Sequence, residues 1–129
     1  MLIGASPVAR LDLDFVNVRS AKGMLRICIA NTAKNFPACK DEHHGIARSM
    51  PASARELLLE GLPPGDYAVA VIHDENGNGK LDTFAGIPRE GFGFSRNPSI
   101  RFGPPSFAAA RFPIDGDGAR QTIRIRYLL

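Results

Sequence analysis

Loop 74–82 carries the residue types and spacing best suited to chemistry. Its sequence, Asp-Glu-Asn-Gly-Asn-Gly-Lys-Leu-Asp, places oxygen-bearing side chains at Asp74, Asn76, Asn78 and Asp82. This spacing matches the start of a calcium-binding loop of the form D-x-[DN]-x-[DN]-G-x-x-D. Calcium takes six to eight hard oxygen ligands, and alternate side chains of a tight loop converge on one point. The residues therefore predict a Ca²⁺ site in this loop.

The loop supplies only part of the usual ligand set. Where a helix–loop–helix site carries a bidentate Glu, this sequence has Ala85. We expect Lys80 to offer its backbone carbonyl, and Glu90 or a carbonyl near Phe84 to complete the shell. The main alternative is a metal-free loop, because Asn and Asp side chains bond their own backbone and Asn-Gly suits left-handed turns. Another metal is the third interpretation.

Two cysteines, Cys28 and Cys39, form a second candidate feature. Alternation along Met24–Ala30 places Cys28 opposite the aliphatic face of that run. A returning loop would bring Cys39 to it and close a ring of about a dozen residues, worth roughly 3 kcal/mol. This disulfide requires an oxidising compartment. The alternatives are two free thiols or a metal pair, although two cysteines without nearby His make a poor zinc site.

The histidines and carboxylates offer little for catalysis. His43 and His44 lie in a polar loop, where two ligands do not make a metal site. His73 precedes Asp74 and is either a base oriented by that carboxylate or a residue that hydrogen-bonds at a strand end. The sequence has no nucleophile elbow, HExxH, P-loop or dinucleotide fingerprint. We expect no catalytic residue and no enzyme; a small metal-dependent hydrolase using His73, Asp74 and Glu90 is the weaker alternative.

The composition describes one ordinary globular domain. The chain has 129 residues, 44% hydrophobic and 22% charged, with a net charge of +3. Arg124 and Arg126 alternate with isoleucines, which is typical of a solvated strand face and not of a nucleic-acid site. No apolar run reaches the ~18 residues of a membrane span. We expect residues 1–9 to be a flexible N-terminus or the remnant of an export signal, and residues 10–129 to form the domain.

Short strands separated by Gly- and Pro-rich turns are predicted throughout. Tyr67–His73 is apolar on both faces, which is typical of a central strand. Pro105–Ala110 is expected to hold one helical turn capped by Ser106. The predicted fold is an all-β antiparallel sandwich of about seven strands, transthyretin-like or Ig-like. The expected extended segments are Leu11–Val16, Met24–Ala30, Glu56–Glu60, Tyr67–His73, Ser99–Phe102, Ala110–Ile114 and Gln121–Leu128.

Phe92 and Phe94 alternate with glycines in the segment Gly86–Ser95. The ordinary interpretation is an extended segment whose rings cap the core. The sharper one is an aromatic platform beside the ion loop that contacts a ligand, because flanking glycines allow close approach.

Three segments, Leu62–Asp82, Gly86–Ser95 and Phe102–Phe107, resemble a bacterial family known as domain of unknown function 2141. The resemblance covers about Gly23–Ile114. It implies an exported, periplasmic or secreted β-sandwich with no assigned activity. Similar Asp/Asn/Gly loops in the B-type repeats of Gram-positive surface adhesins bind calcium on a transthyretin-like sandwich, which supports the ion site by analogy.

Taken together, these observations predict a non-enzymatic exported β-sandwich that binds calcium through loop 74–82. We expect a protein or glycan ligand at the cell envelope and neither nucleic acid nor a membrane span. A structural or accessory module with a metal-free loop is the alternative.

Overall fold

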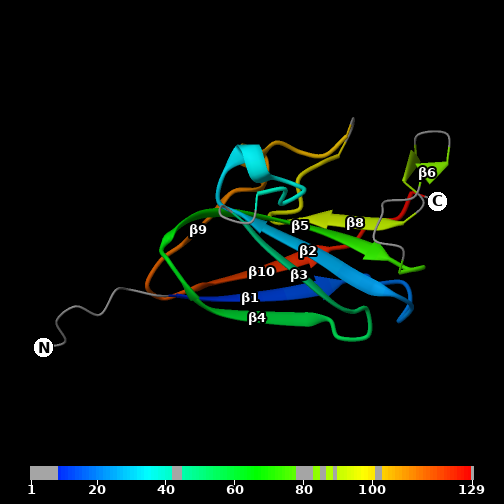
Figure 1. The fold of residues 1–129 in the computed structure, drawn as a ribbon, viewed down its shortest axis with the longest axis horizontal. Coiled ribbons are helices and arrows are strands. Elements are labelled where there is room, and N and C mark those ends of the chain that lie inside the picture. The colour runs from blue at the N-terminus through cyan, green and yellow to red at the C-terminus, as the bar shows by residue number, and fades with distance from the viewer. Residues whose placement is uncertain are drawn as a thin grey trace, which may run out of the picture.

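Two β-sheets face each other across a shared apolar core (Figure 1). The structure is a computed structural model that describes residues 9–41, 45–77, 83–84, 87–88, 90–100 and 103–128. The three-stranded sheet has the order β10-β1-β4, with β1 at Ala9–Val16, β4 at Glu56–Leu62 and β10 at Ala119–Arg124. The predicted all-β sandwich is therefore confirmed.

The larger sheet has five strands. Its order is β3-β2-β5-β8, and β9 pairs with the first part of β5. A separate pair of two-residue strands, β6 and β7, follows β5. The bounds are β2 Met24–Ala30, β3 Gly45–Pro51, β5 Gly65–Asp74, β6 Thr83–Phe84, β7 Ile87–Pro88, β8 Gly91–Phe94 and β9 Phe112–Ile114.

One strand pairing departs from the antiparallel rule. β1 runs parallel to β10, with Leu11 opposite Ala119 and Val16 opposite Arg124. The other named strand pairs are antiparallel. Parallel neighbours cannot be joined by a tight turn, and here almost the whole chain lies between them.

The central strand β5 is buried on both faces, as predicted. Val69 and Val71 lie in the core between the sheets, whereas Ala68 and Ala70 belong to a second apolar cluster. This cluster occupies the face of the larger sheet that points away from β1 and β4, where the 3-10 helix η1 (Ala33–Asn35) also lies (Figure 1). Its buried members are Cys28, Ala30, Phe36, Ala68, Ala70, Phe92, Phe94 and Ala110.

The predicted helical turn is also present. The helix α1 spans Phe107–Ala110, and the Ser106 hydroxyl accepts a hydrogen bond from the Ala109 amide at 3.1 Å. The small alanines of this turn allow it to lie close to the sheet, and Ala110 is fully buried. Among the described residues, no helix is long and apolar enough to cross a membrane.

Several predicted boundaries shift. β4 continues to Leu62 and β5 begins at Gly65, so the turn expected at 61–66 narrows to two prolines. The closing strand ends at Arg124, because the chain then crosses to pair Arg126 with Phe92 of β8. Ser99 and Ile100 form no strand, and Phe102 lies outside the described residues. At the N-terminus, Ala9 already belongs to β1, and residues 1–8 lie outside the described residues.

Candidate functional site

Asp74 ends the central strand with its side chain fully buried. Met24 of β2 lies opposite Asp74, so Arg26, two residues further along β2, projects from the same face. Arg26 Nε donates to Asp74 Oδ2 at 2.7 Å, and its Nη1 donates to Ser49 Oγ of β3 at 3.1 Å. The Asp74 side chain is fully buried, whereas the Arg26 side chain is 35% exposed, so solvent reaches one side of this ion pair. The first residue of the predicted calcium loop is therefore anchored to two neighbouring strands.

Glu90 lies at the same end of the sheet. It immediately precedes Gly91, which pairs with His73 of β5, and its side chain is 4% exposed. The sheet register thus brings Glu90 to the strand end that carries Asp74. Asp74 and Glu90 are well separated in the sequence, so their position at one strand end results from the fold.

The remaining predicted ligands are only partly described. Asn76 is exposed in the turn after β5, where the Gly77 amide donates to the Asp74 carbonyl at 3.2 Å. Asn78, Lys80 and Asp82 lie outside the described residues. Within the part of the chain that is described, no three His, Cys, Asp or Glu side chains form a group that could hold a metal ion. A cation would therefore depend on the loop positions beyond Gly77 and would share Asp74 with Arg26.

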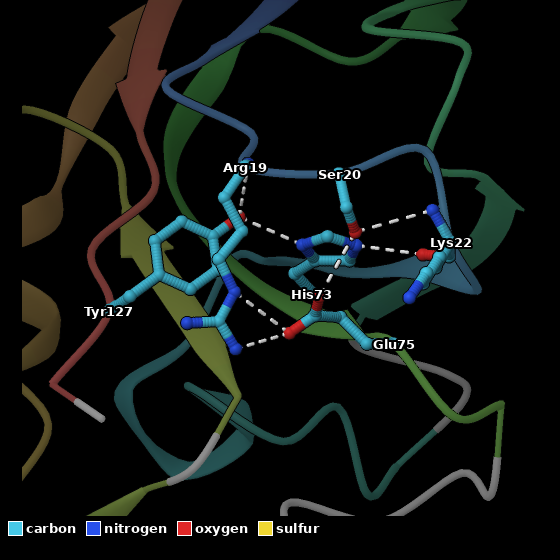
Figure 2. A network of polar contacts seen from close by, with 6 residues as sticks. All are labelled: Arg19, Ser20, Lys22, His73, Glu75 and Tyr127. Atoms are coloured by element: carbon cyan, nitrogen blue, oxygen red, sulfur yellow. Dashed lines mark hydrogen bonds and ion pairs between the residues drawn. The ribbon is translucent and has the colours of Figure 1, made fainter.

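His73 lies in a polar network on the other face of β5 (Figure 2). Its Nδ1 lies 2.8 Å from the Tyr127 hydroxyl and its Nε2 lies 2.8 Å from the Lys22 carbonyl oxygen. A carbonyl only accepts, so Nε2 carries a hydrogen, and in neutral His73 the Tyr127 hydroxyl donates to Nδ1. Both ring nitrogens thus bond to groups other than Asp74. The geometry is that of a buried histidine satisfied at a strand end.

The same network continues to the surface through Arg19. The Arg19 guanidinium bonds to Glu75 and stacks over the Tyr127 ring, 4.3 Å from its centroid. Ser20 Oγ donates to the other Glu75 oxygen at 2.9 Å. The hydrogen bond from Arg19, assisted by Ser20, holds the pKa of Glu75 below its ordinary value, and burial raises the pKa of Tyr127. The network joins the 17–23 segment, the end of β5 and the C-terminal segment (Figure 2).

The sequence did not reveal this network. Arg19 and Tyr127 are 108 residues apart, and neither belongs to a motif. The sequence pattern that bears on it is the run of apolar residues on both faces of β5. This pattern predicts a buried strand ending at His73 but does not identify the partners of His73.

The predicted disulfide is present. Cys28 of β2 and Cys39 are bonded, with their Cα atoms 5.6 Å apart. Buried Asn35 holds the segment between the two cysteines. Its side-chain Nδ2 donates to the Asp41 backbone carbonyl at 2.7 Å, and its Oδ1 accepts from the Asp41 backbone amide at 2.8 Å. The disulfide therefore fixes a polar excursion over the outer face of the sheet.

Phe92 and Phe94 pack into the second apolar cluster, where each is 8% exposed. The Phe94 ring lies 6.0 Å from the Phe36 ring, edge to face. The alternating glycines serve the opposite face: a Cβ at Gly93 would lie 2.8 Å from Ile123 Cγ2. This is the packing that the ordinary interpretation expects. Contact between these rings and a ligand stays a prediction.

These features define a disulfide-linked β-sandwich with buried polar groups at the end of its central strand. Residues 14–123 match a family described as an uncharacterized protein conserved in bacteria, DUF2141. The chain belongs to this family, as the resemblance of its motifs indicated. Comparison with curated proteins gives no match, and comparison with solved structures gives none either.

Proposed function

We propose that this protein is a non-enzymatic, exported β-sandwich module that binds Ca²⁺ in loop 74–82 and a protein or glycan ligand at the cell envelope. The observation that carries the calcium assignment is the position of Asp74. Its carboxylate is anchored by Arg26 at the end of the central strand, and Glu90 arrives at the same strand end.

The calcium assignment extends this anchor into the loop. Asn76, Asn78 and Asp82 would supply side-chain oxygens and Lys80 a carbonyl, with Asp74 shared between the ion and Arg26. Two or three carboxylates near one cation, partly offset by Lys80 and Arg26, favour modest affinity. The ion would cross-link the loop to the sheet and would supply no catalytic step.

Export is supported by the disulfide. A bond between Cys28 and Cys39 persists in oxidising compartments and is rare in the bacterial cytosol. A periplasmic or secreted location therefore fits the covalent structure. Thiol trapping in whole cells tests it: without reductant, a thiol-alkylating reagent should add no mass to the protein. Recovery of the doubly alkylated chain would contradict export.

Thermal unfolding in EDTA, in excess Ca²⁺ and in excess Mg²⁺ tests the ion site. At a calcium concentration a hundred times the dissociation constant, binding adds about 2.7 kcal/mol of stability. For a domain of this size, the melting temperature should rise by several degrees in calcium and less in magnesium.

Variants localise the effect. Asp82→Ala and Asn78→Ala should abolish the calcium-dependent rise, whereas Asp117→Ala, in an exposed turn, should preserve it. Asp74 is unsuitable for this purpose because its loss also breaks the ion pair with Arg26. A melting temperature indifferent to calcium would overturn the site and favour the architectural module with a metal-free loop.

A further inference from the structure

Four arginines gather around the turn that follows β8. Arg96 lies in this turn, and its Nη1 donates to the Arg111 carbonyl at 3.3 Å. Arg126 Nη2 donates to the Asn97 carbonyl at 3.4 Å, and the Arg124 amide donates to Asn97 Oδ1 at 2.8 Å. We call Arg96, Arg111, Arg124 and Arg126 the arginine patch. Its members come from three separate segments, so only the folded chain assembles it.

The turn at Arg96 and Asn97, at the centre of the patch, is held by several hydrogen bonds. Arg96 and Asn97 both have positive φ angles, 65° and 48°, which two consecutive non-glycine residues rarely adopt. The Asn97 side-chain Nδ2 donates to the Thr122 carbonyl at 2.9 Å, and its Oδ1 accepts from the Arg124 backbone amide. The Asn97 side chain therefore caps the edge of β10. The Arg96 amide donates to the Gln121 side chain at 3.0 Å. Backbone strain of this kind clusters at functional sites and persists only where surrounding contacts enforce it.

The four arginines of the patch have no carboxylate partner among the described residues. Arg10, Arg19, Arg26 and Arg120 each lie within 4 Å of a carboxylate. Among the described residues, none of the four patch arginines does. Arg96, Arg111 and Arg124 are exposed and Arg126 is half-buried. The patch thus presents four guanidinium groups that have no carboxylate within 4 Å among the described residues, and such groups attract an anionic partner.

The surface beside Arg124 and Arg126 is shallow. A depression with no room for a water molecule is lined there by Asn97, Ile100, Arg124 and Arg126 together with the largely buried rings of Phe92 and Phe94. Such a surface has no enclosed pocket for a small anion. It fits an extended polymer that presents several anionic groups, because each exposed guanidinium group can bind a phosphate, sulfate or carboxylate in a planar, bidentate way.

We propose that the arginine patch binds an anionic glycan. This inference rests on the envelope-binding role proposed above and names the chemistry of its ligand. The rings of Phe92 and Phe94 that line the depression are only 8% exposed and so are not available to insert into a bilayer, which favours a polymer over a membrane surface. Leu128, two residues beyond Arg126 and 56% exposed, makes anionic lipid the competitor that the experiment must include.

The experiment titrates the full chain, in EDTA, with a heparin-derived octasaccharide as the sulfated probe. Binding is measured by calorimetry over a series of sodium chloride concentrations. The patch variant is Arg124→Gln/Arg126→Gln. The matched control, Arg10→Gln/Arg48→Gln, removes the same charge away from the patch. The melting temperature of each variant verifies folding.

We expect the patch variant to bind about tenfold more weakly, with a shallower dependence of log affinity on log salt, because fewer counterions are released. The control variant should keep the affinity and slope of the natural protein. Absence of octasaccharide binding at 0.15 M salt, or equal losses in both variants, would overturn the proposal. So would tighter, patch-dependent binding to phosphatidylglycerol vesicles than to the octasaccharide. The titration contains no calcium, so its failure is distinguishable from failure of the ion site.

Discussion

The Tyr127 hydroxyl lies 2.8 Å from His73 Nδ1 and accepts the Arg19 amide hydrogen at 3.0 Å. One phenol oxygen therefore connects the central strand, the segment after β1 and the C-terminal segment. Because His73 is fully buried, its ring depends on protein partners for both nitrogens.

Replacing this phenol tests the connection. Tyr127→Phe should lower the free energy of unfolding by about 1–3 kcal/mol, since it leaves His73 Nδ1 without its donor. Urea unfolding followed by circular dichroism measures the change. The comparison is Tyr67→Phe, which loses a 2.7 Å hydrogen bond to the carbonyl of exposed Pro63, a group that water can satisfy. Equal losses in the two variants would refute the role of the buried histidine.

Glu75 should make stability sensitive to acid. The Arg19 hydrogen bond, with help from Ser20, holds its pKa in the folded protein below the ordinary 4.5. The unfolded chain therefore takes up the proton first as pH falls, and stability present above about pH 4.5 is lost through the lower folded pKa. The melting temperature of Glu75→Gln should decline less steeply over this range than that of the natural protein. Glu56→Gln, at an exposed strand position, should decline in parallel with the natural protein; matching curves for all three would contradict the pairing.

The disulfide should contribute substantially to stability. Removing it in Cys28→Ser/Cys39→Ser should cost about 3 kcal/mol, because it closes a loop in the unfolded chain. Chemical denaturation with and without a phosphine reductant measures this contribution. The reductant should destabilise the natural protein and leave the double variant unchanged. A natural protein indifferent to the reductant would show that the bond contributes nothing.

Gly93 is required by close packing between the sheets. A Cβ there would meet Ile123 Cγ2 at 2.8 Å and the Arg124 carbonyl at 2.9 Å, and the backbone atom has little freedom to move. Gly93→Ala should destabilise the fold by about 1–3 kcal/mol. Gly116→Ala is the matched control, because a Cβ there has no neighbour within 4 Å. A Gly93→Ala melting temperature as high as that of the control would contradict this packing.

Periodicity predicted the parts of the fold that local sequence determines. The segment Leu11–Val16 was recognised as extended, and its Leu11, Leu13 and Phe15 lie in the core; the two apolar faces of β5 identified the central strand. Ser106 was recognised as a helix cap because capping depends on residues three apart. The extended segment with Phe92 and Phe94 was recognised, although its pairing with β5 was not.

Long-range pairings had no comparable signal. Nothing in the sequence of β1 specifies that it runs parallel to β10, since no turn joins them. In the candidate ion site, too, local sequence predicted some features and long-range pairing determines others. The loop spacing predicted Asp74 and Asn76, whereas the Arg26 partner of Asp74 depends on the β2–β5 register. Arg124 and Arg126 were interpreted as a solvated strand face, because the other two arginines of the patch, Arg96 and Arg111, come from separate segments.

The parallel pairing of β1 with β10 also bears on the order of folding. The first described strand cannot complete its sheet until residues near 119–124 have been synthesised and have returned across the molecule. Contacts that span such sequence separations are slow to form, because loop closure costs entropy before any contact compensates it. Until then β1 has only β4 beside it, and the apolar side chains that face the core remain accessible to water. The three-stranded sheet is therefore completed only after most of the chain has been synthesised, whereas β2, β3 and β5 can pair earlier.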